Sequence, residues 1–91
     1  MSEHEEIQLR QAVENGARIN EILADPVYQK AVADTEKRLF DEWRQSAPED
    51  TAKREGAFYA LKALDRVQEM LRTVVNAGAH ASHNLRLKGK R

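Results

Sequence analysis

The chain has 91 residues, which is enough for one small domain and too few for a cofactor-binding fold beside a substrate domain. Fifteen basic and fifteen acidic residues give a formal net charge of zero, and aromatic residues make up only 5% of the chain. Because there is no cysteine, disulfide scaffolds, thiolate zinc sites and cysteine nucleophiles are excluded.

The charges are distributed unevenly along the chain. Residues 1–50 contain twelve acids and six bases, whereas residues 51–91 contain three acids and nine bases. This asymmetry favours a basic surface for an anionic partner or the pairing of opposite ends between two copies. The alternative is that a helical hairpin neutralises itself, one arm against the other.

Hydrophobic spacing predicts a first helix over residues 3–24. At 100° per residue, Leu9, Ala12, Gly16, Ile19 and Leu23 fall on one stripe. A glycine inside a helix costs about 1 kcal/mol relative to alanine. Either the helix breaks at Gly16, or the missing side chain allows another backbone to approach closely.

The signals for a second helix, over residues 26–46, are stronger. Asp25 is a good N-cap, and Pro26 follows at the first helical position, where its missing N–H costs nothing. The apolar stripe consists of Tyr28, Val32, Thr35, Leu39 and Trp43. The opposite side carries charges of alternating sign four residues apart, typical of a solvated face: Lys30, Asp34, Arg38 and Glu42.

A third helix is predicted from about residue 51 to residue 77. Pro48 marks the preceding turn, Asp50 or Thr51 caps the helix, and a left-handed Gly78 closes it. Its apolar residues cover an arc of almost 200°, although one helical neighbour needs only about 100°. We therefore expect two neighbours: the second helix, in an antiparallel hairpin, and either the first helix or a helix of another copy.

The predicted fold is all-α, a long antiparallel helical hairpin with an additional N-terminal helix. Residues 1–78 form a single domain, and residues 79–91 form a flexible basic tail. The hairpin places Trp43 near Phe58 at the turn and Tyr28 near Val74 at the open end. The residues expected to pack or to mediate self-association are Leu9, Ile19, Leu23, Leu61, Leu64, Val67, Leu71 and Val74.

No catalytic or metal-binding pattern is present, so we expect neither an enzyme nor a cofactor. His80 and His83 lie three residues apart, but a zinc site needs three or four ligands. The aromatic residues near the turn are expected to plug the closed end of the hairpin. Alternatively, Phe40 and Tyr59 form an exposed anchor for a partner.

The basic tail has two interpretations: a solubilising end, or a segment that binds phosphates on nucleic acid or on an anionic partner. Such binding is salt-sensitive and independent of base sequence. The candidate phosphate contacts are Lys53, Arg54, Arg86, Lys88, Lys90 and Arg91.

The first residues are acidic where a secretory signal is basic, and no run approaches the roughly 20 apolar residues of a membrane span. We therefore expect an intracellular protein without membrane contact.

Several short segments within residues 20–78 resemble small helical proteins of tailed phages and prophages. They are residues 22–28 (ILADPVY), 42–44 (EWR), 48–51 (PEDT), 54–55 (RE), 61–64 (LKAL), Val67 and Gly78. These proteins are encoded among head-assembly and DNA-packaging genes, so the resemblance implies that context and no catalytic residues.

The leading hypothesis is a non-enzymatic, self-associating protein of phage head assembly or DNA packaging. It acts in the host cytoplasm or within the virion, on further copies of itself or on another phage assembly protein. One alternative is a nucleic-acid-binding packaging accessory, similar to a terminase small subunit, that uses the basic tail. The other is a small phage inhibitor of a host protein.

Overall fold

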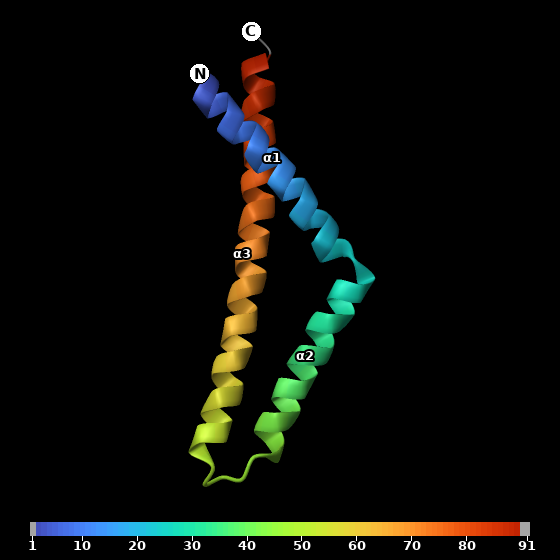
Figure 1. Ribbon diagram of the computed structural model, residues 1–91, viewed down its shortest axis with the longest axis vertical. Helices are drawn as coiled ribbons and strands as arrows, with labels where there is room; N and C mark the ends of the chain where they lie inside the picture. The colour runs from blue at the N-terminus through green and yellow to red at the C-terminus, as the bar shows by residue number, and fades with distance from the viewer. Residues whose placement is uncertain (1, 90–91) are drawn as a thin grey trace. The chain divides into compact units, whose positions relative to one another are not determined.

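The computed structural model describes residues 2–89, and these form three helices and no strand: α1 (Glu3–Ala24), α2 (Pro26–Gln45) and α3 (Thr51–Gly89) (Figure 1). The all-α prediction is confirmed. The contacts between residues fall into two groups. We call residues 2–24 together with 69–89 the terminal unit, and residues 25–68 the hairpin unit.

Side chains just before each helix accept hydrogen bonds from its first free N–H groups, which have no partner within the helix. Before α1, Ser2 Oγ accepts from the amide of Glu5 at 3.1 Å. Asp25 Oδ1 accepts from the amides of Val27 and Tyr28 at 2.7 and 3.3 Å. Asp50 Oδ1 accepts from the amide of Lys53 at 3.1 Å, so the caps predicted for the second and third helices are confirmed.

The predicted end of the third helix is wrong. Helix α3 continues through Gly78 to Gly89, and no described glycine has a positive φ, so Gly78 is not a left-handed cap. The irregular tail expected from Ala79 is therefore helical as far as Gly89. The added turns contain Ala81, which is 2% exposed, so burial supports the helix beyond the predicted end. Lys90 and Arg91 lie outside the described residues.

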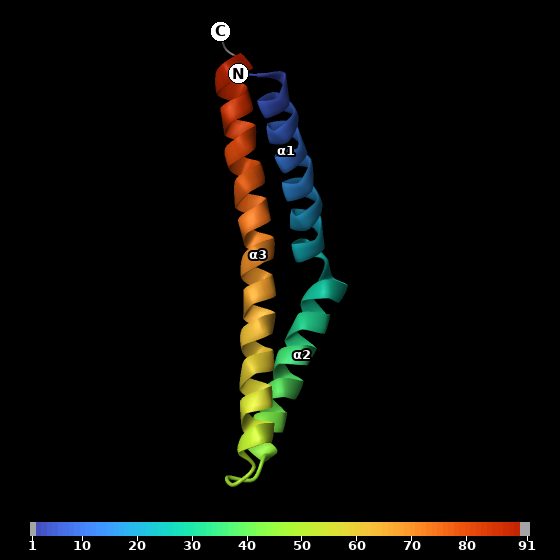
Figure 2. The same ribbon diagram turned by 60° about the vertical axis from the view of Figure 1, so that its left-hand side comes forward.

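In the terminal unit, α1 runs beside the last part of α3 in the opposite direction (Figures 1 and 2). The first helix therefore packs within its own chain. Its predicted stripe is confirmed residue by residue, since Leu9, Ala12, Ile19 and Leu23 are half-buried and Gly16 is buried.

The two backbones of the terminal unit touch at Gly16 and Gly78. A Cβ atom added to Gly16 would lie 2.9 Å from Gly78 Cα and 3.2 Å from the carbonyl oxygen of Val74. A Cβ atom on Gly78 would lie 2.9 Å from the carbonyl oxygen of Ala12. Of the two expectations for Gly16, close approach is therefore correct and a helix break is not.

In the hairpin unit, α2 runs antiparallel to the first part of α3, with a register that differs from the expected one. Tyr28 Oη accepts a hydrogen bond of 2.6 Å from Gln68 Nε2, six residues before the expected neighbour Val74. At the turn, the Arg54 guanidinium lies over the Trp43 ring, 5.7 Å from its centroid, and Phe58 flanks them. Trp43 and Phe58 therefore lie near each other at the turn, as expected, whereas Tyr28 faces Gln68 instead of Val74.

Few large side chains are deeply buried in either unit. Among the described residues, Ala57 and Ala81 are the only buried hydrophobic ones, with 5% and 2% exposure. Val67, one of the residues expected to pack or to mediate self-association, is 54% exposed, whereas the neighbouring Gln68 is half-buried. The other residues expected to pack are half-buried: Leu9, Ile19, Leu23, Leu61, Leu64, Leu71 and Val74. Leu71 and Val74 belong to the terminal unit rather than to the hairpin.

Candidate functional site

Four of the five aromatic residues gather in the hairpin unit, near the turn. They are Phe40 and Trp43 of α2 and Phe58 and Tyr59 of α3, which we call the aromatic patch. Their exposed fractions are 53%, 43%, 50% and 66%, respectively. The prediction that these residues plug the hairpin is wrong, because side chains that close a core do not remain half in water. The exposure agrees with the alternative of an aromatic anchor.

Three of the four rings of the patch, those of Trp43, Phe58 and Tyr59, contact one another or neighbouring cations. The rings of Phe58 and Tyr59 meet edge to face, with centroids 5.6 Å apart and an interplanar angle of 71°. Two cations lie over ring faces: Arg54 over Trp43 at 5.7 Å and Lys62 over Phe58 at 5.5 Å. Such contacts hold the rings in fixed orientations while leaving their remaining surface accessible.

Sequence reasoning missed the two cations of the patch. The sequence pattern predicts Arg54 only as a phosphate contact, and it predicts no role for Lys62 at a site. A signal was present, because Phe58 lies four residues from each of them, and side chains four apart are neighbours on a helix. Arg54 is also fixed to the turn, where its Nη1 donates to the carbonyl oxygen of Pro48 at 3.4 Å.

A small hollow of about 260 Å³ opens within the patch. Its lining consists of Trp43, Thr51, Arg54, Glu55, Phe58 and Tyr59. Pockets for cofactors and drug-sized ligands measure roughly 300–1,000 Å³ and enclose most of the ligand. This hollow is smaller than that range and open to solvent, so it suits a single side chain of a partner better than a small molecule.

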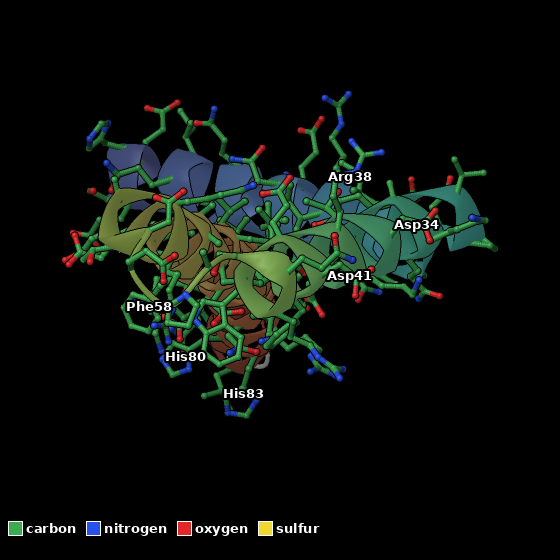
Figure 3. The ribbon with its side chains drawn as sticks, turned by 90° about the horizontal axis from the view of Figure 1, so that it is seen from below. Asp34, Arg38, Asp41, Phe58, His80 and His83 are labelled. Atoms are coloured by element: carbon green, nitrogen blue, oxygen red, sulfur yellow. The ribbon has the colours of Figure 1, made fainter. Side chains whose placement is uncertain are left out.

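The outer side of α2 is charged and solvated, as its alternating signs predicted. Lys30 pairs with Asp34 at 2.6 Å, and Lys37 pairs with Asp41 at 3.7 Å. Figure 3 shows Asp34, Arg38 and Asp41 projecting from α2, apart from Phe58 on α3. The pKa of Lys30 is raised above its ordinary value. The larger cause is the hydrogen bond that Lys30 donates to Asp34, and the smaller is the negative charge of the Asp34 carboxylate.

The candidate phosphate contacts are divided between the two units. Lys53 and Arg54 belong to the hairpin unit, where Arg54 is already engaged by Trp43 and Pro48. Arg86 and Lys88 are exposed on the last turn of α3 in the terminal unit. Lys90 and Arg91, the other two tail residues, are not among the described residues.

The basic end of α3 lies beside the acidic start of α1. Glu5 and Lys88 line one hollow of the terminal unit, and Glu6 and Lys88 line another. Glu6 is also paired with Arg10 at 2.6 Å. Acids at a helix N-terminus and bases at a C-terminus each stabilise the helix through its dipole. The charges of this region therefore have a structural explanation, which agrees with the self-neutralising arrangement.

His80 and His83 are exposed and project outward from α3 (Figure 3). Within residues 2–89, no group of three or more His, Cys, Asp or Glu side chains is arranged to hold a metal ion.

None of the helices in the described part of the chain is long and apolar enough to cross a membrane.

Comparisons of the chain with protein-family models, with curated proteins and with solved structures gave no significant match. The resemblance to small phage proteins therefore stays a prediction.

Proposed function

We propose that this chain is a non-enzymatic helical protein that works by associating with further copies of itself. The observation that carries the proposal is the shortage of buried apolar side chains described above. Among the described residues, ten large hydrophobic side chains are between 43% and 78% exposed. Association that covers such side chains is favourable by about 25 cal/mol for each Å² of apolar surface removed from water.

The sequence resemblance gives this activity a biological context. We propose that the association serves phage head assembly or DNA packaging, in the host cytoplasm or in the virion. Another phage assembly protein is the alternative partner, because an exposed aromatic anchor also suits a different chain.

The nucleic-acid alternative draws less support from the described residues. Lys88 lies beside Glu5 and Glu6 of α1, which reduce the positive potential that attracts phosphates. A few basic contacts give only weak, salt-sensitive binding. No contact favours an inhibitor of a host protein over the other functions.

Sedimentation equilibrium of the full chain, from micromolar to millimolar concentration, tests the proposal. We expect a mass above that of one chain, with the associated fraction rising as concentration rises. Hydrogen exchange of the same samples provides the necessary control. A single-chain mass at every concentration, with all three helices protected from exchange, contradicts self-association.

A further inference from the structure

We infer that two copies meet through the aromatic patch, each placing the same surface against the other around a two-fold axis. This inference rests on the proposed function and adds to it the surface and the symmetry of the contact. Such isologous contacts are the commonest way in which identical chains form closed assemblies.

The area of the patch suits a dimer contact. An aromatic side chain buries about 150–250 Å² when it is fully covered, so the three half-exposed rings that line the hollow offer roughly 300 Å². That is more than a third of the roughly 800 Å² that each partner gives to a standard interface. The rings can therefore form the apolar centre of a dimer contact, and the polar side chains around them can form its rim.

The charges around the patch permit the same surface to meet itself. Residues 49–62 contain three acids and three bases, so the surface has no net charge to repel its copy. Around a two-fold axis, Glu55 of one copy can face Arg54 or Lys62 of the other. The outer side of α2 lacks such an apolar centre, because its residues are charged and paired with one another.

Tyr59 is the side chain best placed to enter the other copy. It is the most exposed ring of the patch, at 66%, and it stands at the edge of the 260 Å³ hollow. In a two-fold contact, Tyr59 of each copy enters the hollow of the other, between Trp43 and Phe58. Tyrosine, tryptophan and arginine together are the residues that most often dominate binding energy in interfaces.

The chain contains a built-in reporter of this contact, because Trp43 is its only tryptophan and lines the hollow. Burial of the indole ring shifts its fluorescence to shorter wavelength. If Tyr59 of a second copy covers Trp43, this shift follows the same concentration dependence as the mass.

The experiment compares four full-length variants with the unaltered chain, by sedimentation equilibrium and Trp43 fluorescence over the same concentrations. Tyr59→Glu and the uncharged Tyr59→Ala should each raise the dissociation constant at least tenfold and leave Trp43 in water. Tyr59→Phe keeps the ring and should associate as the unaltered chain does. Met70→Glu is the matched control, because Met70 is also on α3 and 60% exposed but lies outside the patch.

Two results would overturn the inference. If Tyr59→Glu and Tyr59→Ala both associate as the unaltered chain does, whatever Met70→Glu does, the copies meet through another face and only the inference fails. If the unaltered chain is a single folded chain at every concentration, the proposed function fails as well. Because Tyr59 is mostly in solvent, we expect circular dichroism of all the Tyr59 variants to show unchanged helix content.

Discussion

In the terminal unit the helices meet where neither has a side chain, at Gly16 and Gly78, whereas in the hairpin unit they meet through Tyr28, Trp43 and Arg54. The first contact is a backbone-to-backbone approach that leaves no room for an added atom. The second is made by large side chains that remain partly in water. The two units should therefore differ in which substitutions they tolerate.

The comparison also bears on where a partner can bind. The glycine contact brings the helices so close that its residues are buried and offer nothing to a second chain. The aromatic patch of the hairpin unit leaves about half of each ring available. The same short chain thus has one unit closed at its centre and another with exposed apolar surface near its turn, which is where we propose that self-association occurs.

The largest expected effect is at Gly78, where alanine breaks the contact of the terminal unit. Alanine favours a helix by about 1 kcal/mol over glycine. Its Cβ atom, however, would lie 2.9 Å from both the Ala12 carbonyl oxygen and Gly16 Cα, so backbone must move. Such overpacking costs about 1–3 kcal/mol, and after the gain in helix preference we expect Gly78→Ala to destabilise the protein by up to about 2 kcal/mol net. Urea unfolding followed by circular dichroism measures this.

Gly56 provides the matched control on the same helix. A Cβ atom added there meets nothing within 4 Å, so only the helix preference acts. We expect Gly56→Ala to stabilise the protein by about 0.5–1 kcal/mol at the same protein concentration. Equal stabilisation by both alanines would show that α1 and α3 do not touch at Gly78.

The glycines also show why the end of α3 could not be predicted. A glycine near the end of an apolar pattern favours a left-handed cap, and a glycine inside a helix can instead mark a close backbone approach. The choice at Gly78 depends on Gly16, which is distant in the sequence. By contrast, the stripe of α1 and the caps at Asp25 and Asp50 depend on residues close in sequence, and these were predicted correctly.

A smaller effect is expected at Tyr28, whose hydroxyl defines the register of the hairpin unit. Tyr28→Phe removes the hydrogen bond from Gln68 and should cost about 0.5–1.5 kcal/mol in the free energy of unfolding. Tyr59→Phe is the control, because no described hydrogen bond involves its exposed hydroxyl. If the two substitutions have the same effect, Tyr28 does not face Gln68, and the register expected from the sequence regains support.

For a related reason, the sequence does not predict the register of α2 against α3 or the exposure of the rings in the aromatic patch. Helical spacing identifies which residues of α2 face α3, but not which residue lies opposite which. The hairpin brings Trp43 near Phe58, as expected, but it is Arg54 that covers the face of the Trp43 ring. Exposure of the rings follows from packing that the sequence pattern does not specify.

The smallest effect is expected on the solvated side of α2, where the side chains of Lys30 and Asp34 are 76% and 62% exposed. Asp34 raises the pKa of Lys30 above its ordinary value of 10.5 by accepting a hydrogen bond and by its charge. Because the folded-state pKa is the higher one, any stabilisation is complete below pH 10.5 and is lost as pH rises through the raised value. Asp34→Asn should therefore lower the pKa of Lys30, which NMR titration of its side chain measures.

The control is Asp41→Asn, which removes the charged partner of Lys37 instead and should leave the titration of Lys30 unchanged. Identical Lys30 titrations in the unaltered chain and in Asp34→Asn contradict the pairing. We expect neither substitution to change the mass in solution, because this surface is separate from the aromatic patch.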